Sequence, residues 1–138
     1  MTARIAMAVA LATLAAPAGA NEITGLWATG SAGGKVEIYR CGGALCGRIV
    51  DASRLRANPD LRDVRNGDPA LRTRRLRGLI VLQGFTGGPR DWRGGPVYDP
   101  ESGDGARRGF LKLLPDGTLE LKGCVAMFCR TKLWTRIR

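Results

Sequence analysis

The sequence of 138 residues contains no histidine. Histidine is the commonest general base and the commonest metal ligand in proteins, so its absence excludes the usual serine and cysteine hydrolase triads. The glycine pairs Gly42-Gly43 and Gly87-Gly88 are not followed by the lysine and hydroxyl residue of a phosphate-binding loop. The sequence therefore predicts no bound metal, no cofactor and no catalytic residue of these types.

Long apolar runs are also missing, except at the beginning of the chain. Arg4 is followed by a largely apolar run from Ile5 to Ala16, and Ala18-Gly19-Ala20 supplies the small residues of a cleavage site. A membrane-spanning helix needs about 20 apolar residues, and no segment approaches that length. We expect residues 1–20 to be a cleaved signal peptide. The remaining protein is then periplasmic or secreted, with no transmembrane segment.

Acidic residues are scarce relative to basic ones. Residues 21–138 carry 21 basic and 12 acidic side chains, and many of the cations lie between Arg54 and Arg77. This excess favours an anionic envelope partner such as a lipid, lipopolysaccharide or another polymer. A solvated surface that keeps the protein soluble explains the charge equally simply. Nucleic acid is not expected, because this stretch has no aromatic residue for stacking on bases and the protein is exported.

All four cysteines lie beyond the expected signal peptide and form two C-x4-C pairs. Disulfides persist in exported proteins. The spacing favours the local pairs Cys41–Cys46 and Cys124–Cys129, because a short hairpin loop brings its flanking residues within bonding distance. Zinc bound by the four thiolates and a cross-pairing of the two hairpins are the alternatives.

Helical periodicity is nearly absent. The chain instead consists of short alternating or apolar runs separated by glycine, proline and aspartate, which predicts consecutive β-strands. About eight such strands can close into an antiparallel up-and-down barrel, with an open two-sheet sandwich as the alternative. The interior of such a barrel is either filled by side chains or holds one small ligand. The expected strands are 23–29, 35–40, 47–51, 79–85, 92–99, 107–114, 118–125 and 130–137.

One stretch, from Ala52 to Gly78, lacks strand alternation and is rich in Arg, Asn, Asp and Pro. We expect a long surface excursion, with a short helix over Pro69 to Arg77 that begins at Asp68 as its N-cap. Long loops in compact domains are often functional. A candidate ligand-binding group therefore lies here, with guanidiniums that would clamp an anion; the alternative is a loop that satisfies its own polar groups. The candidate residues are Asp63, Asn66, Asp68, Arg72, Arg74 and Arg75.

An ordered series of short motifs runs through residues 25–136: Gly25-x-Trp27, Tyr39-Arg40-Cys41, Leu45-Cys46-Gly47-x-Ile49, Asn66-x-Asp68-Pro69-x-Leu71-Arg72, Leu76-x-Gly78, Gly84-Phe85, Trp92-x-Gly94-Gly95, Tyr98-Asp99-Pro100, Gly123-Cys124 and Trp134-Thr135-Arg136. The series resembles the bacterial secreted family known as domain of unknown function 2147. The resemblance implies one periplasmic or secreted lipocalin-like domain over residues 21–138, without an established activity. It also implies that Arg136 packs its guanidinium over the Trp27 ring.

Three hypotheses of function remain. The leading one is a non-enzymatic binding protein for an anionic or small envelope ligand. The second is an envelope-acting hydrolase that uses the acidic cluster of Asp99, Glu101 and Asp104, since paired carboxylates serve glycoside cleavage. The third is a structural or partner-binding protein without a pocket. A hollow barrel favours the first two over the third.

Overall fold

The computed structural model of the protein describes residues 8–12 and 22–138. Residues 8–12 have no regular secondary structure. Most of the expected signal peptide lies outside the described residues, so its cleavage stays a prediction. Within the described part of the chain, no helix is both long and apolar enough to cross a membrane.

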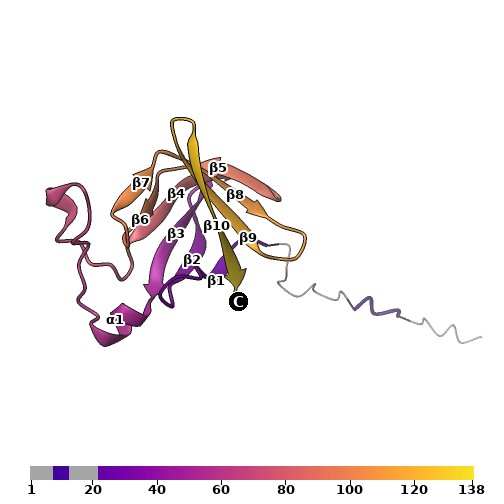
Figure 1. The fold of residues 1–138 in the computed structure, drawn as a ribbon. Coiled ribbons are helices and arrows are strands. Elements are labelled where there is room, and N and C mark those ends of the chain that lie inside the picture. The colour runs from indigo at the N-terminus through magenta and orange to yellow at the C-terminus, as the bar shows by residue number, and fades with distance from the viewer. Residues whose placement is uncertain (1–7, 13–21) are drawn as a thin grey trace, which may run out of the picture.

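In the part of the chain that the structure describes, ten antiparallel strands make up the fold (Figure 1). Strand β1 pairs with both β2 and β10, and β3 pairs with β4, so the order β1-β2-β3-β4-β5-β8-β9-β10 closes on itself. The expected eight-stranded barrel is therefore confirmed, and the open sandwich is excluded. The strands are β1 (Gly25–Ala28), β2 (Lys35–Cys41), β3 (Ala44–Asp51), β4 (Ile80–Gly87), β5 (Asp91–Gly94), β6 (Val97–Asp99), β7 (Asp104–Ala106), β8 (Arg108–Leu113), β9 (Leu119–Val125) and β10 (Phe128–Arg136).

The strand expected over residues 92–99 is divided into β5 and β6. Between them Gly95 has φ +144°, and a Cβ at this position would lie 2.0 Å from the Arg107 carbonyl oxygen. Only glycine accepts this backbone and this close approach. The break lets β6 leave the barrel wall, pair with β4 at Leu82 and Val97, and form a separate hairpin with β7.

Because neighbouring strands are antiparallel, their connections alternate between the two ends of the barrel. One end, which we call the open end, has the β1–β2 turn, the excursion 52–79, the β6–β7 turn and the β9–β10 tip. The other end, the closed end, has the β2–β3, β4–β5 and β8–β9 turns. The two cysteine pairs therefore lie at opposite ends.

Both cysteine pairs are disulfide-bonded in the local pairing expected from their spacing. Cys41 is bonded to Cys46 with a Cα–Cα distance of 5.8 Å, and Cys124 to Cys129 with a distance of 4.1 Å. The second pair occupies directly opposed positions of β9 and β10. Each bond fixes one hairpin.

The excursion departs from the expectation. Helix α1 (Ser53–Ala57) was not predicted, and it buries Leu55. The helix predicted over Pro69 to Arg77 is wrong: only a 3₁₀ turn, η1 (Pro69–Leu71), forms behind the Asp68 cap. The residues that follow are held extended, because Asp63 N donates to Arg74 O at 2.9 Å and Leu76 N donates to Leu61 O at 3.0 Å. These hydrogen bonds between two segments of the excursion take the place of the hydrogen bonds of a helix.

Candidate ligand-binding cavity

The barrel is hollow at its open end. A cavity of about 610 Å³ occupies this half of the interior, a volume within the usual range of small-molecule sites. Its floor and walls are apolar. They are formed mainly by Val36, Ile49, Val81, Val97, Leu121 and Trp134.

The cavity exists because inward side chains become small or flexible towards the open end. Along β9, the inward positions run from Leu119 and Leu121, which are buried, to Gly123 and Val125. A Cβ added to Gly123 would lie 3.3 Å from the Ala106 Cβ. Large side chains at these positions would fill the space, as leucine does further down the same strand.

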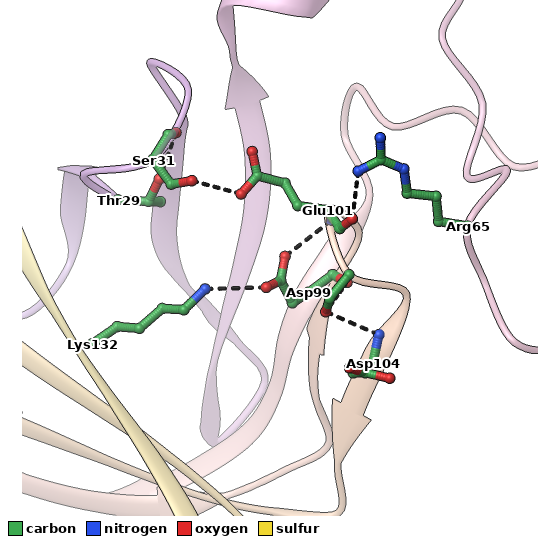
Figure 2. Close-up of polar contacts among 8 residues, drawn as sticks. Thr29, Ser31, Arg65, Asp99, Glu101, Asp104 and Lys132 are labelled. Carbon is green, nitrogen blue, oxygen red and sulfur yellow. Dashed lines mark hydrogen bonds and ion pairs between the residues drawn. The ribbon is translucent and has the colours of Figure 1, made fainter.

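The rim of the cavity is polar and ties three elements together, as Figure 2 shows. Lys132 Nζ on β10 lies 3.1 Å from Asp99 Oδ2 on β6. Ser31 Oγ, in the β1–β2 turn, donates to Glu101 Oε2 at 2.6 Å. The Asp99 carboxylate also accepts from the Glu101 backbone N at 3.0 Å. The carboxylates of Asp99 and Glu101 are therefore already engaged, whereas that of Asp104, also at the rim, makes no hydrogen bond or ion pair with any residue that the structure describes.

The end of β3 holds a second set of charges at the rim. Asp51 Oδ2 lies 3.5 Å from Lys35 Nζ and 2.7 Å from Arg56 Nη1. Desolvation alone raises the pKa of Asp51, but the hydrogen bond and charge of Arg56 outweigh it, so the pKa is lowered and the group is ionised at neutral pH. Arg130 also lines the cavity, and its side chain makes no hydrogen bond or ion pair with any residue that the structure describes.

Three of the candidate residues in the excursion form one buried cluster. Asp63, which is 1% exposed, accepts hydrogen bonds from Tyr98 Oη at 2.5 Å, Asn66 Nδ2 at 2.9 Å and Arg74 Nη2 at 3.0 Å. Desolvation raises the pKa of Asp63, but these three donors and the Arg74 charge together lower it below its usual value. Burial and the Asp63 carboxylate raise the pKa of Tyr98 to about 12. The cluster anchors the excursion to β6.

The other three candidates lie apart from the Asp63 carboxylate. Asp68 accepts from the Ala70 backbone N at 3.0 Å as the cap of η1, and Arg72 Nε donates to the Asn66 carbonyl at 2.8 Å. Arg75 pairs with Asp60 at 3.5 Å on the exposed surface. None of the six candidates lines the cavity; of the excursion, only Ala52 does. The structure thus brings Asp63, Asn66 and Arg74 together. Asp68 and Arg72 are bonded to Asn66 and not to the Asp63 carboxylate, and Arg75 lies outside the cluster.

Most of the residues that line the cavity were not singled out from the sequence. Asp99, Glu101 and Asp104 were considered as an acidic cluster, and they lie at the rim. Arg130 and Lys132 alternate with Trp134 along β10, and this pattern of inward charge above an inward aromatic residue was the available indication. Within the described residues, no group of three or more acidic or cysteine side chains is arranged to hold a metal ion.

The closed end is filled. Trp27 is fully buried, its Nε1 donates to the Ile23 carbonyl at 2.9 Å, and the Arg136 guanidinium carbon lies 4.4 Å from the centroid of its ring. Arg136 also donates to the backbone carbonyls of Thr24 and Glu22. These contacts join the start of the barrel to its last strand and seal this end.

A closed antiparallel barrel with one sealed end and one hollow end defines a lipocalin-like protein. The protein HP1028 from Helicobacter pylori, described as belonging to the lipocalin family, has a similar structure with a TM-score of 0.64 and 21% sequence identity; the match covers 76% of this chain and 73% of that one. The chain itself belongs to the family described as "Uncharacterized protein conserved in bacteria (DUF2147)", which matches residues 25–136. No curated protein matches the chain significantly.

Proposed function

We propose that the protein binds a small anionic amphiphile, with the apolar part inside the barrel and the charged head at the rim. The observation that carries the proposal is the cavity of about 610 Å³ with apolar walls and a charged mouth. Such a cavity buries most of a small apolar ligand, while the few polar groups at its entrance fix the orientation. It favours a binding protein over a structural protein without a pocket.

The sign of the head group follows from the pairing of the rim charges. Asp51, Asp99 and Glu101 already accept hydrogen bonds or ion pairs, which leaves the Asp104 carboxylate and the Arg130 guanidinium without a side-chain partner within the described residues. The excess of basic over acidic side chains in the sequence then favours an anionic head over a cationic one. A guanidinium remains charged at any relevant pH and holds two oxygens of a carboxylate or phosphate at once. We therefore place the anionic head at Arg130, with Lys132 beside it on β10.

The proposal also includes the location of the protein. The amino-terminal sequence has the pattern of a signal peptide, and two local disulfides are stable in an oxidising compartment. Both observations support a periplasmic or secreted binding protein. Intact mass spectrometry of the protein exported by a Gram-negative host tests this part, and a chain that retains residues 1–20 would contradict it.

The ligand class is tested with three twelve-carbon amphiphiles that differ only in the head: dodecanoate, dodecanol and dodecyltrimethylammonium. We expect dodecanoate to bind most tightly by calorimetry. Ile49→Trp fills the cavity and is expected to abolish binding of dodecanoate, because Ile49 is half-buried in its wall. Ile80→Trp is the matched control, since Ile80 is 45% exposed and lies outside the cavity. Equal effects of the two variants would show that binding is not in the barrel.

Arg130→Gln tests the head-group assignment. We expect dodecanoate to bind about tenfold more weakly and dodecanol to be unaffected, since a hydrogen-bonded charge at a site contributes about 1.5–3 kcal/mol. Arg93→Gln removes an exposed arginine on β5, outside the cavity lining, and is the control. If instead Arg72→Gln with Arg75→Gln removes the preference for dodecanoate, the anion site is in the excursion and the assignment to Arg130 is wrong.

A further inference from the structure

The tip of the β9–β10 hairpin exposes three large apolar side chains. Val125, Met127 and Phe128 are 60%, 86% and 78% exposed, respectively. Single exposed apolar residues are ordinary on protein surfaces, but a contiguous group marks an interaction site. The tip stands uppermost in the view of Figure 1, beyond the other loops of the barrel. The three exposed side chains are therefore accessible to a membrane or to another protein.

The tip is held in a defined shape. The Cys124–Cys129 disulfide closes it, and Val125 is paired with Phe128 immediately above that bond. Arg108 Nη2 on the neighbouring strand β8 donates to the Ala126 carbonyl at 2.8 Å. The three apolar side chains are thus presented by a short, tethered hairpin, which loses little conformational freedom when it docks.

The strands beneath the tip are basic. Residues 105–110 and 122–132, which include the open-end halves of β8, β9 and β10, contain five basic side chains and no acidic one. Arg107, Arg108 and Arg130 are exposed next to the tip. The carboxylates of the rim lie on other elements, with Asp51 at the end of β3 and the others in the β6–β7 hairpin, where Asp99 pairs with Lys132. The five basic residues are Arg107, Arg108, Lys122, Arg130 and Lys132.

We propose that this tip docks the protein on anionic phospholipid bilayers. Apolar side chains that enter the boundary between head groups and acyl chains, flanked by cations that contact the head groups, are the combination that binds interfaces of this kind. The hairpin at the closed end is the internal contrast, because between Cys41 and Cys46 it has only Gly42, Gly43, Ala44 and Leu45, and Leu45 is buried.

Docking also orients the cavity. Val125 and Phe128 belong to the tip and also line the mouth of the cavity. When the tip is docked on a bilayer, the mouth of the cavity therefore faces the lipid. The inference goes beyond the proposed function and does not depend on it, because the surface would dock whether or not the cavity is occupied. Met127 makes the two separable, since it belongs to the tip and does not line the cavity.

Co-sedimentation with vesicles tests the docking. We expect the full protein to bind vesicles of phosphatidylcholine and phosphatidylglycerol in equal parts, to bind pure phosphatidylcholine at least about tenfold more weakly, and to dissociate as salt screens the charges. Met127→Asp is expected to weaken binding to the mixed vesicles by about tenfold, because a carboxylate would have to enter the bilayer boundary. Val64→Asp is the matched control: Val64 is 62% exposed but lies in the excursion.

Met127→Trp gives a direct readout of the position of the tip. The three native tryptophans are buried, but Trp134 lines the cavity, so a blue shift on addition of vesicles and quenching by brominated lipid are assigned to the new indole where they exceed those of the native protein. Absence of quenching, or equal weakening by Met127→Asp and Val64→Asp, would overturn the proposal. A stable dimer that Met127→Asp dissociates, without binding to either vesicle, would also overturn it and assign the tip to self-association. Binding of dodecanoate by Met127→Asp is expected to be unchanged.

Discussion

The two ends of the barrel are built from the same strands, but the inward side chains fill the interior at one end and leave it hollow at the other. Towards the closed end, large residues meet in the axis: Trp27, Phe85, Leu113 and Leu119 are at most 1% exposed. Towards the open end, the inward positions are Gly123, Ala106, Val36 and charged residues, and a cavity remains. Whether an eight-stranded barrel is filled or hollow is thus decided position by position, and not by the number of strands.

The difference between the two ends also assigns stability mainly to the closed end and the proposed binding to the open end. The closed end has a continuous apolar core, a stacked tryptophan and arginine, and backbone bonds from Arg136 that join the chain ends. The open end replaces part of that packing by empty volume and by ion pairs exposed to solvent, which contribute little to stability. We therefore expect substitutions at the closed end to act on unfolding, and those at the open end to act on ligands and membranes.

The largest expected effect is that of Trp27→Ala. The indole is fully buried, and its removal leaves a cavity in the filled half, so the free energy of unfolding should fall by about 4 kcal/mol. Ile49→Ala at the open end is the comparison. Its side chain is half-buried beside a space that already exists, and its loss should cost about 1 kcal/mol.

Urea unfolding followed by far-ultraviolet circular dichroism measures both variants, provided that the slope of the transition is unchanged. Equal losses of unfolding free energy in Trp27→Ala and Ile49→Ala would contradict the proposed difference between the two ends, because they would mean that the open half is packed as tightly as the closed half. Such a result would also argue against the cavity as a binding site.

Much of the barrel was predictable because its physical causes are local. Strict alternation, as at Val36 and Ile38 of β2, indicates one buried face, and turn residues such as Pro115-Asp116-Gly117 mark the hairpins. The Cys124–Cys129 pairing followed from hairpin geometry. These features depend on residues close together in sequence.

What escaped prediction depends on residues far apart. The helix expected over Pro69 to Arg77 does not form, because residues 74–76 make backbone hydrogen bonds with residues 61–63. No local sequence pattern indicates this pairing. The cavity is formed by side chains of β2, β3, β4, β6, β9 and β10, and whether they meet is a property of the closed barrel. Asp63 was singled out as a candidate site residue, but its contact with Tyr98 spans 35 positions.

Asp63→Asn is expected to have the second largest effect. The carboxylate is buried between Tyr98, Asn66 and Arg74, so removal of its charge should cost about 3 kcal/mol at neutral pH. Asp60→Asn is the control. Asp60 is largely exposed and pairs with Arg75 at 3.5 Å, so its loss should cost less than about 0.5 kcal/mol. Comparison of the two variants by urea unfolding tests whether the Asp63 cluster holds the excursion beside the open end.

The same variant predicts a pH dependence. The pKa of Asp63 is lower in the folded protein than in the unfolded chain, so its contribution is complete above the unfolded value of about 3.9 and is lost as the pH falls through the folded value. Stability of the native protein should therefore decline below about pH 4, and Asp63→Asn should flatten that decline. An identical acid limb in the variant would show that Asp63 is not a main source of the pH dependence.

The smallest expected effect compares the two disulfides, one at each end. Each closes a loop of the same sequence separation, so chain entropy predicts the same stabilisation of about 2 kcal/mol for both. The double variants Cys41→Ser with Cys46→Ser and Cys124→Ser with Cys129→Ser should thus lower the urea midpoint alike and still fold. Only the second should weaken binding to anionic vesicles, because only that bond shapes an exposed apolar tip. If both weaken vesicle binding equally, the effect comes from global stability, and the two ends do not differ in the way proposed.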